Sequence, residues 1–151
     1  MSYLKERLAS IDRSVVIEDT VRLIDDEVSR KSGLSGMAIK GGYKVVKKLQ
    51  GGRMIHKAVD MLLDDFTGAL APVHDEFRAQ GDVTSFSDFL VQQNMRASDA
   101  LLKITDDKAA RAKTRVLKKT YDQLRGQAER HVVDALPGVG RLIDRHVPRT
   151  Q

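Results

Sequence analysis

Residues 33–66 read GLSGMAIKGGYKVVKKLQGGRMIHKAVDMLLDDF, two periodic apolar segments separated by paired glycines. The first segment has small and apolar residues at helical spacing, namely Ala38, Gly42, Val45 and Leu49. The second has a stronger stripe of the same period, made by Ile55, Val59, Leu62, Phe66 and Leu70. Gly51 and Gly52 favour a chain reversal between them. We therefore expect an antiparallel helical hairpin whose first helix has Ser35 as its N-cap.

Two glycines lie inside the first expected helix. Gly41 and Gly42 each cost about 1 kcal/mol there relative to Ala. A helix tolerates this cost most readily where another backbone must come close, so Ala38 and Gly42 predict a close-packing notch for a neighbouring helix. If that neighbour belongs to another chain, the protein is a homo-oligomer or an adaptor that acts through helix–helix contacts.

The two halves of the hairpin have opposite charge. No Asp or Glu occurs in residues 31–57, whereas the second helix is acidic. An antiparallel turn would set Lys44 opposite Asp60 and Lys40 opposite Asp64. The lysines are then either a phosphate-binding face or, as we favour, paired or solvated charges that contribute ~0–1 kcal/mol each. This secondary basic face comprises Lys40, Lys44, Lys47 and Lys48.

Composition limits the class of protein. A chain of 151 residues can bury its own core as one domain. The absence of Cys excludes disulfides, thiolate zinc sites and thiol catalysis, and it is typical of a reducing cytoplasm. The opening MSYLKERLAS has no apolar signal region, and no apolar run reaches the ~20 residues of a membrane-spanning helix. A cytoplasmic location is therefore expected, and the formal charge of +5 favours anionic partners.

The expected fold is all-α, since aromatic residues are few and Ala, Leu, Lys, Arg and Asp are abundant. We expect a single domain over residues 1–151, a compact bundle of five to seven helices built on two antiparallel helical hairpins. Proline, glycine and polar residues predict a looser connection at 72–84 between the halves 1–71 and 85–151.

Capping signals place further helix boundaries. A cap at Ser10 or Asp12 begins a helix that ends near Arg30. Ser85 starts a capping-box pattern, and the helix that follows it is interrupted at residues 93–94.

A long basic helix is expected between Thr105 and Pro137. Its cations form the candidate anion-binding site: Arg111, Arg115, Lys118, Lys119 and Arg125. Such a face can lie along the phosphate backbone of a nucleic acid without reading bases. The alternative is a solvated face, or one docked on the acidic helix near Asp25.

No catalytic signature is present. His56, Asp60 and Asp64 follow one another at four-residue steps on one helix face, but ligands on a straight helix spread by ~6 Å per step. We therefore expect no metal, cofactor or catalytic residue, and we favour a non-enzymatic protein over an enzyme.

Residues 136–140, LPGVG, resemble the turn of helix-hairpin-helix modules, which present backbone amides to a DNA phosphate. The pattern departs from those modules at Asp144, where a small residue is expected, and at Pro148, which ends the second helix early. A Pro-Gly helix terminus followed by a short C-terminal helix explains the same letters, so both interpretations stay open.

The strings KSGLSGMAIKGGYKVVKK at 31–48, MLLDDF at 61–66 and ASDALLKITD at 97–106 are similar to a family of small bacterial all-helical proteins of unassigned function. The resemblance spans most of the chain. It implies a bacterial cytoplasmic protein and assigns no site residues. The leading hypothesis is a basic helical module that binds nucleic acid or another acidic macromolecule. Self-association is the second hypothesis, and peripheral contact with anionic lipid is the third, less favoured one.

Overall fold

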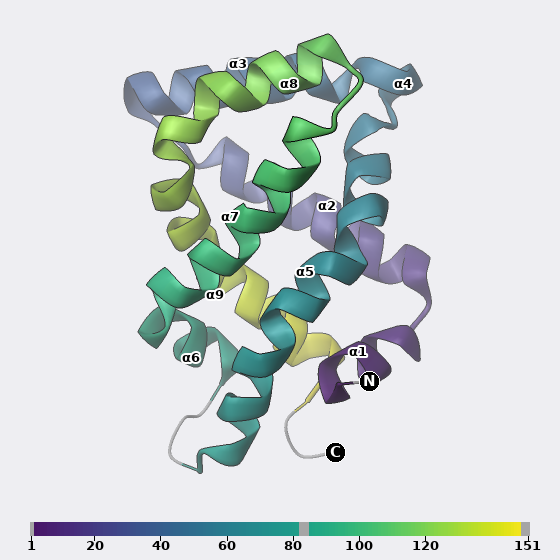
Figure 1. The fold of residues 1–151 in the computed structure, drawn as a ribbon, viewed down its shortest axis with the longest axis vertical. Coiled ribbons are helices and arrows are strands. Elements are labelled where there is room, and N and C mark those ends of the chain that lie inside the picture. The colour runs from purple at the N-terminus through teal and green to yellow at the C-terminus, as the bar shows by residue number, and fades with distance from the viewer. Residues whose placement is uncertain (1, 82–84, 149–151) are drawn as a thin grey trace.

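The computed structural model describes residues 2–81 and 85–148. Its helices are α1 Tyr3–Ala9, α2 Arg13–Ser29, α3 Gly33–Lys47, α4 Leu49–Gly52, α5 Met54–Ala79, α6 Phe86–Gln92, α7 Asn94–Ala110, α8 Arg115–Leu124, the 3-10 helix η1 Arg125–Gln127, and α9 Ala128–His146. No strand occurs in either described range. The expected all-α bundle is confirmed (Figure 1).

Two of the predicted helix starts are confirmed by side-chain caps. Asp12 accepts a hydrogen bond from the backbone N–H of Ser14 at 3.0 Å, and Ser85 accepts one from Asp88 at 3.0 Å. Ser35 is not a cap, because α3 already begins at Gly33. Its hydroxyl oxygen instead lies 2.8 Å from Nε2 of His131.

The predicted break at Gly51 and Gly52 is confirmed, but the prediction of an antiparallel hairpin around it is wrong. Gln50, Gly51 and Gly52 all have positive φ, which ends the first helical segment and reorients the chain. Figure 1 shows α3 lying across one end of the molecule, while α5 runs away from that end instead of alongside α3. The cross-hairpin ion pairs of Lys40 and Lys44 therefore do not form.

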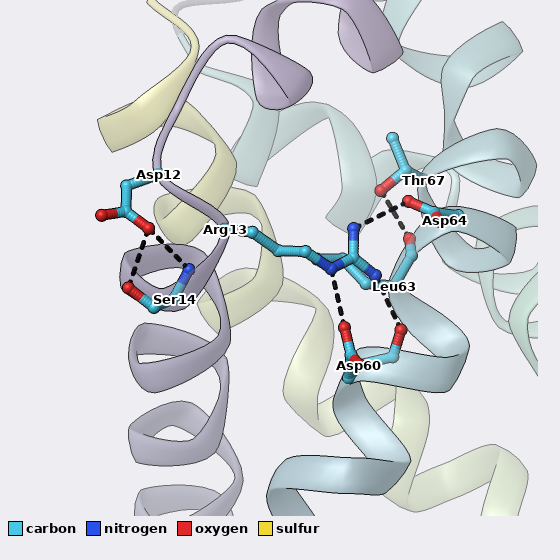
Figure 2. A network of polar contacts seen from close by, with 7 residues as sticks. All are labelled: Asp12, Arg13, Ser14, Asp60, Leu63, Asp64 and Thr67. Carbon is cyan, nitrogen blue, oxygen red and sulfur yellow. Dashed lines mark hydrogen bonds and ion pairs between the residues drawn. The ribbon is translucent and has the colours of Figure 1, made fainter.

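Asp60 and Asp64, the expected partners of these lysines, bind Arg13 instead (Figure 2). Its Nε donates to Oδ1 of Asp60 at 2.7 Å, and its two terminal nitrogens donate to the carbonyl oxygen of Asp60 at 2.7 Å and to Oδ1 of Asp64 at 3.1 Å. A guanidinium fork matches this set of acceptors better than single ammonium groups do. The acidic face of α5 thus holds the start of α2, and the lysines of α3 lack these partners.

The core lies at the opposite end from α3, where α1, α5, α6, α7 and α9 meet. Its largest side chains are Phe77, Phe86 and Phe89. The looser connection was predicted over 72–84, but residues 72–79 belong to α5, which continues through Pro72 as far as Ala79, and residues 82–84 lie outside the described ranges. Burial of Val73 and Phe77 on that last stretch outweighs the helix-breaking effect of the proline.

The LPGVG string lies inside α9, so neither a DNA-binding hairpin nor a helix terminus forms there. Leu136 and Ile143 are buried and continue the helical period across it. A Cβ on Gly140 would lie 2.3 Å from Cα of Ser87, so the small residue allows α6 to approach α9 backbone to backbone. Asp144, the residue that departs from the hairpin pattern, accepts the N–H groups of Phe86 at 3.0 Å and Ser87 at 3.2 Å.

The prediction of one long helix between Thr105 and Pro137 is also wrong. The helix α7 passes through Thr105 and ends at Ala110, and α8 begins only at Arg115. Tyr121 donates to Oδ1 of Asp106 at 2.5 Å, which folds α8 back over the end of α7. The interruption predicted at 93–94 is confirmed by the break between α6 and α7.

Candidate interface for an anionic partner

The predicted notch in α3 exists, and its neighbour is α8 of the same chain. A Cβ on Gly42 would lie 2.9 Å from Cγ2 of Thr120 and 3.6 Å from Cδ1 of Leu124. Ala38, the other half of the predicted notch, is exposed. Figure 1 shows α3 and α8 side by side and running in opposite directions at one end of the molecule. We call this surface, with the turn at residues 111–114, the α3/α8 end.

The α3/α8 end brings together two basic segments that are far apart in the sequence. Eight of its exposed cations form no ion pair within the described residues: Lys40, Lys44, Lys48, Arg111, Lys113, Arg115, Lys118 and Lys119. Both the primary and the secondary basic faces expected from the sequence therefore lie on one surface.

Two predicted site residues have carboxylate partners. Arg125 donates to both oxygens of Asp106, at 2.7 and 3.0 Å, and this contact lowers the pKa of the Asp106 carboxyl. Nζ of Lys47 lies 3.4 Å from Asp25, which also accepts the hydroxyl of Tyr43. Arg125 and Lys47 thus connect the α3/α8 end to α7 and α2.

Charge is segregated along the molecule. Residues 31–57 and 108–121 contain 13 of the 26 Lys and Arg residues and none of the 21 Asp and Glu residues. The rest of the chain holds 13 cationic and 21 acidic residues, a formal charge of −8. Asp122 is an exposed carboxylate of α8 just beyond the second segment. The two segments, which include α3 and most of α8, thus carry a formal charge of +13, well above the net charge of +5 of the whole chain.

The basic residues of α8 surround a shallow, open hollow. It is lined by Ala112, Lys113, Arg115, Lys118, Lys119, Asp122 and Gln123. An open basic hollow suits a surface phosphate rather than an enclosed small molecule.

An exposed apolar strip on α3 was not predicted from the sequence. The strip consists of Leu34, Met37, Ala38, Gly41 and Val45, all exposed. The exposed fraction is 88% for Leu34, 70% for Met37 and 49% for Val45. Ala38 and Val45 were expected to face inward, but the face of α3 that packs inward carries Tyr43 and Val46. Since α3 has apolar residues on both faces, periodicity alone did not distinguish them.

Residues 4–147 match the sequence profile of a family of unknown function, DUF6918. The chain belongs to this family. No curated protein and no solved structure matches the chain. The resemblance to an unassigned helical family is thereby confirmed, and the interface in this member of DUF6918 has to be interpreted from its own chemistry.

The side chains considered for a metal or catalytic site do not converge in the described residues. No group of three or more His, Asp or Glu residues within 2–81 and 85–148 has the arrangement of a metal site. Nε2 of His56 lies 3.1 Å from Glu18, whereas Asp60 and Asp64 bind Arg13. No helix in these ranges is long and apolar enough to span a membrane.

Proposed function

We propose that this protein is a non-enzymatic binding module whose α3/α8 end contacts an anionic, phosphate-rich partner such as nucleic acid. The observation that supports the proposal is the convergence of two acid-free segments on one surface, with eight exposed cations that lack carboxylate partners within the described residues. Phosphate groups would neutralise these cations and release condensed counterions, which gives affinity without sequence specificity.

Binding of this kind would use the phosphate backbone rather than the bases. The tyrosines of α3 and α8 are half-buried, and both hydroxyls donate to carboxylates: Tyr43 to Asp25 and Tyr121 to Asp106. They are therefore not free to stack on exposed bases, as single-strand binders require. Nucleic acid would be bound by charge and shape.

A bacterial, cytoplasmic setting belongs to the same proposal. The absence of Cys from all 151 residues supports a reducing compartment. Negatively charged polymers and surfaces are abundant there, and a positive surface raises the rate of encounter with them.

Self-association is a second candidate, favoured by the exposed Leu34 and Met37. Face-to-face pairing of two copies would juxtapose two α3/α8 ends, and their like charges repel. Sedimentation velocity separates the alternatives, since a concentration-dependent dimer lost on substitution of Leu34 and Met37 by serine would support self-association.

The binding proposal is tested with two phosphate-rich probes, a labelled DNA duplex and vesicles containing an anionic phospholipid. Neutralisation of four phosphates by Arg111, Arg115, Lys118 and Lys119 predicts that affinity for the duplex falls about 100-fold between about 50 and 200 mM salt. The double variant Arg115→Glu/Lys119→Glu should lose binding to either probe, whereas Lys103→Glu, an exposed change on α7, should not. Binding to neither probe, or binding unaffected by the double variant, would refute the proposal.

A further inference from the structure

We infer that the anionic partner of the α3/α8 end is the surface of a lipid bilayer with anionic headgroups, into which the apolar strip of α3 inserts. The inference rests on the proposed function and specifies its partner. In this arrangement the protein lies on the membrane and does not span it.

The apolar strip is continuous along α3. Leu34, Ala38, Gly41 and Val45 follow one another at steps of three or four residues, and Met37 lies beside them, so all five share one side of the helix. Leu34 and Met37 are the two most exposed large hydrophobic side chains of the described residues, at 88% and 70%. Val116, at 41%, lies one helical turn from Thr120, which packs on Gly42. The α3/α8 end thus holds four of the eight exposed large hydrophobic residues described.

Basic residues border this strip on both sides. Lys40 and Lys44 lie four residues apart along one side of α3, and both are exposed. On the other side, Gly42 brings α8 against α3, with Arg115 and Lys119 exposed on α8. An apolar band between two rows of cations is the arrangement by which amphipathic helices bind at the interface of anionic membranes.

A nucleic acid matches only half of this surface. Phosphates would pair with the cations, but a phosphate backbone offers Leu34 and Met37 no apolar environment. A second copy of the chain would cover the apolar strip but would bring like charges together. The bilayer interface supplies both components, since headgroup phosphates face the cations and acyl chains receive the apolar side chains.

The surface is already folded for this contact. The opposite face of α3 is docked on the protein, with Val46 buried and Tyr43 hydrogen-bonded to Asp25 on α2. Binding therefore does not require α3 to fold at the membrane, in contrast to peptides that become helical only there. The side chains of Leu34 and Met37 project from a helix held in place.

The test compares two double variants with matched controls in vesicle co-sedimentation, using phosphatidylcholine vesicles with and without phosphatidylglycerol. The wild-type chain should bind only the anionic vesicles. Leu34→Ser/Met37→Ser should lower the partition coefficient about tenfold or more, because the inserted apolar area is removed. Met61→Ser, on α5, should have no effect, although Met61 is exposed to a similar extent, at 66%. Circular dichroism melting checks that each variant is folded.

The outcomes separate this inference from the broader proposal. If the charge variant Arg115→Glu/Lys119→Glu abolishes binding to a DNA duplex while Leu34→Ser/Met37→Ser changes neither duplex nor vesicle binding, the partner is a nucleic acid and the bilayer inference is wrong. Equal binding to vesicles with and without anionic lipid would also overturn it. A dimer in sedimentation velocity that disappears in the serine variant would assign the apolar strip to self-association instead.

Discussion

Gly140 illustrates how one residue determines the approach of two helices. Because Gly140 has no side chain, the backbone of Ser87 on α6 packs directly against it. A Cβ at position 140 would lie only 2.3 Å from Cα of Ser87. Ser87 also donates its hydroxyl to the carbonyl oxygen of Pro137 at 2.9 Å, and Asp144 accepts the N–H groups that begin α6. We predict that Gly140→Ala lowers the free energy of unfolding by about 2–3 kcal/mol, as overpacking of a close contact does.

Gly126→Ala is the matched control, because nothing lies within 4 Å of a Cβ at that position. Urea denaturation of the two variants should separate them clearly. Equal stabilities for Gly140→Ala and Gly126→Ala would show that α6 and α9 can move apart without loss.

His74 makes the core sensitive to acid. The residue is fully buried among aromatic rings, with its ring centre 4.7 Å from that of Phe86, and neither ring nitrogen has a hydrogen-bond partner. Burial, assisted by the charge of Arg78, lowers the pKa of His74 from 6.5 to about 4. The unfolded chain therefore binds a proton more readily than the folded chain does.

Its contribution to stability is complete above the unfolded pKa of 6.5 and is lost as the pH falls from 6.5 toward about 4. We expect the free energy of unfolding to fall by on the order of 2–3 kcal/mol over this pH interval. His74→Leu should flatten the dependence of the free energy of unfolding on pH, leaving the smaller contribution of His131, whose pKa burial also lowers. An unchanged slope in His74→Leu, measured by chemical denaturation from pH 7 to 4.5, would show that other groups control the acid response.

At the scale of the elements, only one of two adjacent glycines on α3 lies against α8. Gly41 is exposed, with no atom within 4 Å of a Cβ there, whereas Gly42 touches Thr120 and Leu124. Gly41→Ala should raise the free energy of unfolding by about 0.5–1 kcal/mol, since alanine favours the helix. Gly42→Leu should lower it by about 1–3 kcal/mol, because α8 must move away.

Hydrogen exchange provides the second measurement for this pair. The amides of α8 should exchange faster in Gly42→Leu and be unchanged in Gly41→Ala. If both variants stabilise the protein alike, α8 is not packed on α3 in solution.

At the scale of the whole molecule, the distribution of charge should matter more than the net charge. The variants Arg115→Glu/Lys119→Glu and Lys103→Glu/Arg141→Glu each lower the formal charge from +5 to +1. The first removes charge from the α3/α8 end and the second from exposed positions on α7 and α9. We expect the first variant to elute from a cation-exchange column at much lower salt than the second. Co-elution would mean that no localised basic surface dominates.

Local signals in the sequence predicted a good part of the fold. The caps at Asp12 and Ser85, the break at the paired glycines and the interruption after Gln92 were all visible, because each depends on residues only a few positions apart. The basic cations of the candidate site were also named from the sequence. That they share a surface was not foreseen, since it depends on the contact between Gly42 and Thr120.

The amino-acid sequence by itself determined the all-α class, many helix boundaries and the absence of carboxylates from residues 31–57. Only the tertiary structure decided which charges are neutralised. Arg13 binds Asp60 and Asp64, and Arg125 binds Asp106, while Lys40 and Lys44 of α3 form no ion pair within the described residues. The physical reason is that helix formation follows from contacts three or four residues apart, whereas ion pairing and the exposure of an apolar face depend on packing between distant segments.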